Sequence, residues 1–107
     1  MEFQINNVYW RIVFTSPTSD LLRRSDGSLT CGVTDENTHC VYLSNMLRGE
    51  FLRRVICHEL VHCFMMSHSI HIPIDQEEFI ASWMSEYGAD LIYLLDDLLL
   101  AFHRKVA

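Results

Sequence analysis

The feature that most constrains this chain is the segment His58-Glu59-Leu60-Val61-His62, an H-E-x-x-H pattern inside a largely apolar run. On an α-helix, residues four apart lie about 40° apart around the axis, so His58 and His62 project from one face. Two imidazole nitrogens aimed at one point suit a tetrahedral Zn²⁺ site. Glu59 lies about 100° away, too far round for a ligand but suitably placed for a general base acting on a metal-activated water. The alternative is a helix with two hydrogen-bonded core histidines.

Composition limits the class of protein. The 107 residues are 50% hydrophobic and 21% charged, which is typical of one globular domain spanning residues 1–107. The net charge is −6 and the basic residues are scattered, so neither nucleic acid nor an anionic membrane is expected as a partner. The N-terminus lacks the regions of a signal peptide, and no apolar run approaches the ~20 residues of a membrane span. We therefore expect a soluble, cytoplasmic protein.

The four cysteines are expected to be reduced, because nothing in the sequence indicates secretion. Cys57 and Cys63 flank the two histidines, but their helical angles point roughly 100° or more away from them, which predicts core residues and not ligands. Cys31 and Cys40 fall on predicted neighbouring strands and could meet there.

Three segments rich in β-branched and aromatic residues predict strands at about 7–15, 28–34 and 38–43. Strand 38–43 is a candidate edge on which an extended peptide could pair. The order of elements predicts an α+β fold, in which a small, mostly antiparallel three-stranded sheet packs against two long helices as a minimal zincin-like domain.

The two helices are predicted at about 46–66 and 75–103. Ser44 or Asn45 can cap the first helix. Asp75, followed three residues later by Glu78, resembles a capping box at the start of the second.

A catalytic zinc site needs a third protein ligand, and the sequence offers three candidates. His68 has the spacing of the third histidine of metzincins, although Met65 replaces the glycine that turns the chain there. Glu86 shares a helical stripe with Asp90, Tyr93 and Asp97, which is typical of a solvated face.

Glu78 is favoured. It heads a stripe of small residues along which the motif helix can approach closely, consisting of Ser82, Ser85 and Ala89. The strongly apolar stripe on the opposite side is expected to pack elsewhere; it consists of Ile80, Trp83, Tyr87, Leu91 and Leu98. The alternative role for Glu78 is a helix-capping carboxylate.

Segments 58–62, 78–83 and 87–88, together with Gly32-Val33-Thr34-Asp35, resemble small phage-type metallopeptidase-like proteins. The chain is more distantly similar to ImmA/IrrE-type metallopeptidase domains and to gluzincins. The resemblance implies one Zn²⁺ held by His58, His62 and Glu78, with Glu59 as general base. Where that pattern has an acidic or amide residue four after the ligand glutamate, this chain has Ser82, which can accept a hydrogen bond but carries no charge.

The sequence therefore predicts a zinc-dependent peptidase that acts on a peptide or protein substrate. The alternative is a non-catalytic, zinc-stabilised binding or regulatory module of phage or mobile-element origin, which the small size favours. A third hypothesis is a latent enzyme whose site is blocked by its own N-terminus or by self-association. The leucine-rich last helix has more apolar surface than one neighbour needs, which predicts a homodimer through that helix.

Overall fold

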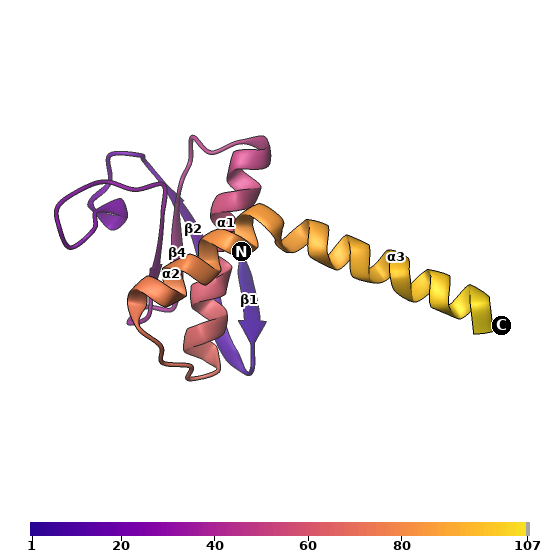
Figure 1. Ribbon diagram of the computed structural model, residues 1–107. Coiled ribbons are helices and arrows are strands. Elements are labelled where there is room, and N and C mark those ends of the chain that lie inside the picture. Colours follow the sequence, from indigo (N-terminus) through magenta and orange to yellow (C-terminus); the bar gives the residue numbers. More distant parts are fainter. Residues whose placement is uncertain (107) are drawn as a thin grey trace.

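Four strands form one mixed sheet in the order β1-β2-β4-β3 in the computed structural model, which describes residues 1–106 (Figure 1). Strand β1 (Glu2–Ile5) is antiparallel to β2 (Val8–Thr15), and β2 is parallel to β4 (Cys40–Ser44). Strand β3 (Gly32–Asp35) is antiparallel to β4 and forms the edge. The α+β class is confirmed, whereas a three-stranded, mostly antiparallel sheet was the wrong prediction.

The additional strand comes from the first residues of the chain. β1 and β2 are joined by Asn6 and Asn7, with φ of 49° and 65°, and two consecutive residues of positive φ are typical of a tight hairpin whose twist matches that of its strands. The parallel β2–β4 pair needs a long connection, which contains the short 3₁₀ helix η1 (Asp20–Leu22) and β3. As a result β4 is an inner strand, and the predicted edge at 38–43 is wrong.

The motif lies on α1 (Gly49–Ser67), which packs against one face of the sheet. The helix begins after Arg48 with no side-chain cap, so capping by Ser44 or Asn45 is not observed. Ser44 Oγ instead accepts a hydrogen bond from the Met46 N–H, in the turn that precedes the helix.

The predicted second helix is three consecutive segments: α2 (Ile74–Trp83), the π-helical turn η2 (Met84–Gly88) and α3 (Ala89–Val106). Pro73 occupies the N-cap position and no side chain caps α2, so the predicted capping box at Asp75 is wrong. Segment η2 packs against α1, while α3 continues away from the rest of the molecule (Figure 1). The molecule is therefore elongated, with principal extents of 56 × 30 × 27 Å.

The core lies between the sheet and α1. Trp10 of β2 is fully buried, and its indole N–H donates a 2.8 Å hydrogen bond to Ser67 Oγ at the end of α1. Around it pack the buried residues Ile5, Val41, Leu43, Leu47 and Cys63. Because α1 is held along this face, its other side, with the two histidines, is left for α2.

Gly32 permits β3 to lie close to α1. A Cβ at this position would lie 2.9 Å from Val55 Cγ1, 3.1 Å from Glu59 Cγ and 3.2 Å from Leu43 Cδ2. These separations are shorter than packed carbon atoms adopt. Glycine at the start of β3 thus sets the distance between the edge strand and the motif helix.

The four cysteines are free thiols. The register of β3 and β4 pairs Gly32 with Leu43 and Asp35 with Cys40. Cys31 and Cys40 therefore lie at opposite ends of this strand pair and do not meet. Within residues 1–106, none of the helices has the length and apolar character needed to cross a bilayer.

Candidate metal site

His58 and His62 of α1 face Glu78 of α2. His58 Nε2 lies 3.0 Å from Glu78 Oε2, and His62 Nε2 lies 3.0 Å from Glu78 Oε1. The ligand atoms of these three residues all lie within 4.8 Å of one another. Two imidazoles and a carboxylate are a donor set that Zn²⁺ accepts. Of the sequence-predicted ligands, the structure brings together these three, so the group can hold a metal ion.

The neighbouring residue, Glu77, contacts the other nitrogen of His62. His62 Nδ1 lies 2.6 Å from Glu77 Oε2, and both side chains are buried. A carboxylate that accepts from Nδ1–H fixes the ring and leaves Nε2 as the nitrogen that can ligate a metal. Sequence reasoning assigned this position to Ser82, which is exposed here; the available signal was the second glutamate directly before Glu78.

This arrangement leaves His62 between two carboxylates. A neutral imidazole has one N–H donor and one lone pair, so if Nδ1–H donates to Glu77, Nε2 presents a lone pair to Glu78. Two acceptors 3.0 Å apart repel each other unless a proton or a cation lies between them. The site also gathers the carboxylates of Glu59, Glu77 and Glu78 around two histidines, and a divalent cation would offset that negative charge.

Glu59 is buried on the same helix beside the edge strand. Its Oε1 accepts a 2.9 Å hydrogen bond from Thr34 Oγ1 of β3. The same hydroxyl lies 3.2 Å from the Glu59 carbonyl oxygen, so Thr34 ties this residue of α1 to the edge strand. Sequence reasoning did not single out Thr34 alone, although it noted segment 32–35 as part of the family resemblance.

The other candidate ligands lie elsewhere. The carboxylate of Glu86 forms an ion pair with Arg54, at 2.9 Å between Oε1 and Nη1. His68 follows the end of α1, is exposed, and stacks on Phe64 with ring centroids 6.0 Å apart. Neither residue joins the group of His58, His62 and Glu78 within the described part of the chain.

The face of α2 and η2 that packs against α1 is shifted by a single residue toward the N-terminus from the predicted face. The buried positions are Glu77, Ala81 and Gly88, whereas the predicted stripe began at Glu78 and continued through Ser82. Glu78 consequently lies at the border of the contact, with 49% of its side chain exposed. The border position leaves its carboxylate open to solvent on one side.

Cys57 and Cys63 point away from the group, as their helical angles predict. Cys63 is fully buried in the core, and burial raises the pKa of its thiol to about 12. Burial also raises the pKa of the Cys57 thiol, although the nearby Arg53 opposes this. Neither thiol belongs to the group of His58, His62 and Glu78 within residues 1–106.

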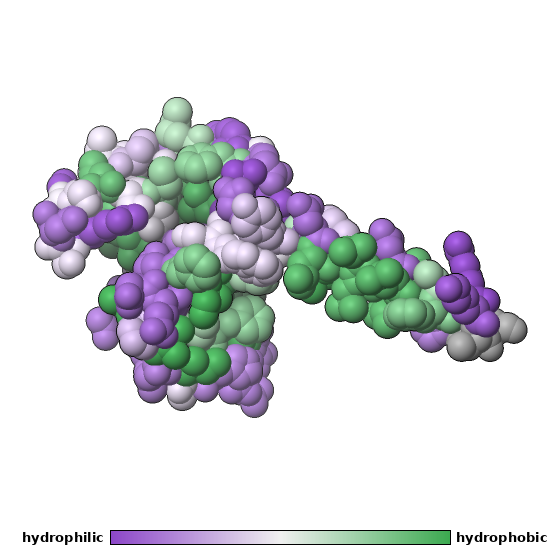
Figure 2. Space-filling model, viewed as in Figure 1, coloured by the Kyte–Doolittle hydropathy of each residue, from purple (hydrophilic) through white to green (hydrophobic). Residues whose placement is uncertain are grey.

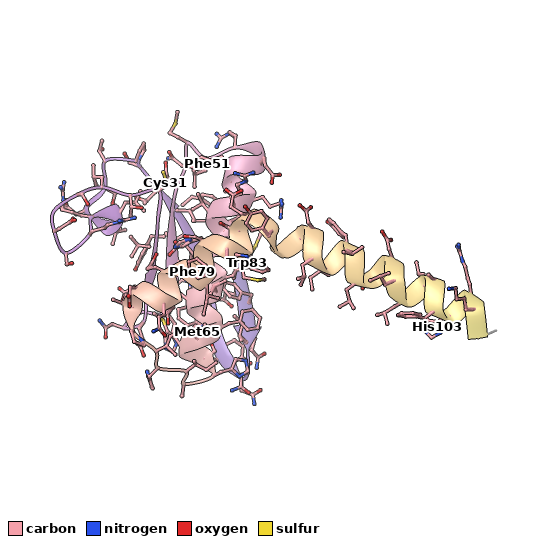
Figure 3. The ribbon with its side chains drawn as sticks, viewed as in Figure 1. Cys31, Phe51, Met65, Phe79, Trp83 and His103 are labelled. Carbon is pink, nitrogen blue, oxygen red and sulfur yellow. The ribbon has the colours of Figure 1, made fainter. Side chains whose placement is uncertain are left out.

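A cavity of about 490 Å³ opens onto the site between β3 and α2. Its walls include the two histidines, Glu59, Glu78 and the edge-strand segment Gly32–Thr34. A second cavity of about 480 Å³ also reaches His58 and Glu59, and its apolar wall consists of Leu29, Phe51 and Val55. In Figure 3, Phe51 and Cys31 mark this side of the site, and Phe79 marks α2 where it crosses α1. The candidate site thus has room for a ligand.

Comparison of the chain with protein-family models, with curated proteins and with solved structures finds no match.

Proposed function

We propose that this protein is a zinc-dependent peptidase whose metal ligands are His58, His62 and Glu78. The observation that carries the proposal is the position of His62, between Glu77 at Nδ1 and Glu78 at Nε2. In a metal-binding histidine, one ring nitrogen typically donates to a carboxylate that orients the ring, and the other faces the metal and its remaining ligands. Glu77 and Glu78 match these two positions around His62. The H-E-x-x-H spacing and its resemblance to small metallopeptidase-like proteins support the same function.

When bound, Zn²⁺ supplies a water that ionises near neutral pH and polarises the carbonyl of a peptide bond. Glu59 is the residue of this chain that would take the proton from that water and pass it to the leaving amine. Thr34 donates to Glu59 Oε1, which leaves the second carboxylate oxygen for proton transfer. Glu77 keeps the His62 ring in place.

The edge strand β3 offers a place for an extended substrate. The Cys31 carbonyl accepts from the Ser44 N–H, and hydrogen-bonding residues alternate along an antiparallel strand. Val33 and Asp35 therefore pair with β4, whereas Gly32 and Thr34 direct their backbone groups outward. Gly32 and Thr34 also line the cavity at the histidines, so a peptide added to this edge would pass the metal.

The alternative function is a non-catalytic module stabilised by zinc. A structural zinc site is closed by four protein ligands, whereas the group in residues 1–106 contains three potential ligands and borders a cavity. A structural site also has no use for a buried Glu59 beside it. These two observations favour the enzyme over the module.

The first test is the zinc content of untagged protein by elemental mass spectrometry. The wild type is expected to hold close to one zinc per chain, and Glu78→Ala to lose most of it. Glu86→Ala is the matched control. It also removes a glutamate carboxylate, but from η2, where Glu86 pairs with Arg54. Zinc retained in Glu78→Ala, or absent from the wild type, would refute the ligand set.

Activity is tested separately with Glu59→Gln, which removes the general base and leaves the three ligands. We expect this variant to bind zinc like the wild type and to lose cleavage of unstructured protein substrates by at least ~10²-fold. Zinc binding without cleavage in the wild type would favour the non-catalytic module.

A further inference from the structure

The α3 helix carries a long apolar face that no other part of the described chain covers. One side of the helix carries four large apolar residues spaced four, three and four apart, namely Leu91, Leu95, Leu98 and Phe102. Ile92 and Leu99 lie next to them. Each of these six residues, here named the α3 stripe, is between 46% and 61% exposed. The green band along the projecting helix in Figure 2 shows this face, and the side chains of α3 in Figure 3 extend into solvent.

The apolar area that this helix exposes is larger than a helix without a partner normally presents to water. Six half-exposed side chains of this size present on the order of 500 Å² of apolar surface, and contiguous patches above a few hundred Å² mark interaction sites. A pair of such faces would bury roughly 1,000 Å², the size at which specific interfaces begin. The α3 helix is about 27 Å long, enough for five helical turns of contact.

We propose that the α3 stripe binds the α3 stripe of a second copy of this chain, with the two helices antiparallel. Spacings of four and three are those of a helix pair that packs along a seam. One patch that pairs with itself about a two-fold axis forms a closed dimer and does not continue into a filament.

Charge favours the antiparallel orientation. The N-terminal end of α3 carries Asp90, and its last turn carries His103, Arg104 and Lys105. When the helices run in opposite directions about an axis near residues 96–97, the acidic end of each lies beside the basic end of the other. The helix dipoles also oppose each other in that arrangement. A parallel pair would place like charges together at both ends.

The same charges argue against a membrane surface as the occupant. Helices that lie on anionic bilayers carry lysine and arginine on the polar face. The polar face of α3 instead includes Asp90, Asp96 and Asp97, which an anionic surface would repel. A second copy therefore satisfies both the apolar face and the charges.

The test is the oligomeric state of the full chain by sedimentation velocity, for the wild type, Leu98→Glu and Leu100→Glu. Leu98 lies in the α3 stripe, whereas Leu100 lies on the opposite face and is 58% exposed. Both variants make the same substitution in the same helix, two residues apart. The wild type and Leu100→Glu are expected to be dimers at about 50 μM, and Leu98→Glu a monomer, since its dimer should be on the order of 100-fold weaker.

A monomeric wild type would overturn the proposal, as would equal effects of the two substitutions. Monomers that bind vesicles rich in phosphatidylserine would overturn it in favour of a membrane surface. Orientation is tested by oxidation: Phe102→Cys should cross-link with Leu91→Cys and not with itself, and self-cross-linking would overturn the antiparallel pair. The α3 stripe shares no residue with the metal site, so zinc content measured on the same samples reports separately on the proposed function.

Discussion

Replacing Glu77 by glutamine tests how far the proposed metal site depends on the residue that contacts His62 Nδ1. Glutamine has nearly the size of glutamate and keeps an acceptor oxygen, but it carries no charge. The contact that it alters is a 2.6 Å hydrogen bond between two side chains that are 9% and 12% exposed. Loss of such an outer partner typically weakens metal affinity 10- to 100-fold, which corresponds to about 1.4–2.7 kcal/mol. Because this contact is short, buried and charge-assisted, we expect the upper half of that range.

The assay is a zinc titration in competition with a chromophoric chelator at pH 7.5. Glu86→Gln makes the same change on η2, at a residue that pairs with Arg54 and does not join the histidine group. Glu86→Gln should bind zinc with the affinity of the wild type. Circular dichroism and thermal unfolding of the zinc-free proteins would show whether either variant alters the fold. If correctly folded Glu77→Gln binds zinc with wild-type affinity, the orienting role of Glu77 is refuted.

Four further outcomes are expected. Gly32→Ala should lower the free energy of unfolding by about 1–3 kcal/mol in chemical denaturation, because its Cβ would meet Val55 and Glu59. Thr34→Val should keep zinc but lower kcat about 10-fold, since it removes the hydrogen bond to Glu59; an unchanged rate would contradict this role. A chelator should lower the Tm of the wild type and leave that of Glu78→Ala unchanged in calorimetry. Cys63 should resist a thiol reagent until the protein unfolds, because it is fully buried.

The motif helix was predictable because its information is local. The spacing of His58 and His62 fixes their common direction on any helix, and α1 covers residues 49–67 where a helix was predicted at 46–66. The exclusion of Cys57 and Cys63 as ligands followed from the same angles. Glu78 was favoured from a stripe of small residues, and it does lie opposite the two histidines.

The sheet was harder to predict because its pairing depends on contacts distant in sequence. Segment 2–5 alternates polar and apolar residues, but four residues are too few for this alternation to indicate a strand. It becomes β1 because the turn at Asn6 and Asn7 brings it beside β2. The parallel pairing of β2 and β4 joins residues about thirty positions apart, which no local pattern specifies. The choice of edge strand follows from that pairing, so it was wrong as well.

The error of one residue on α2 explains why Glu77 was missed, and it suggests a rule for similar sequences. Helical angles alone fix the relative directions of residues 77 and 78, about 100° apart, but not which of them points at α1. Packing settles this by burying Glu77 and Ala81. Two adjacent glutamates on a helix point about 100° apart, so they do not both reach one metal ion. They can contact the two nitrogens of one imidazole, because Nδ1 and Nε2 point to different sides of the ring. Glu77 and Glu78 contact His62 in this way. In the proposed site this adjacent acidic pair supplies a ligand, Glu78, and its orienting partner, Glu77, and the Glu77→Gln titration tests that division of roles.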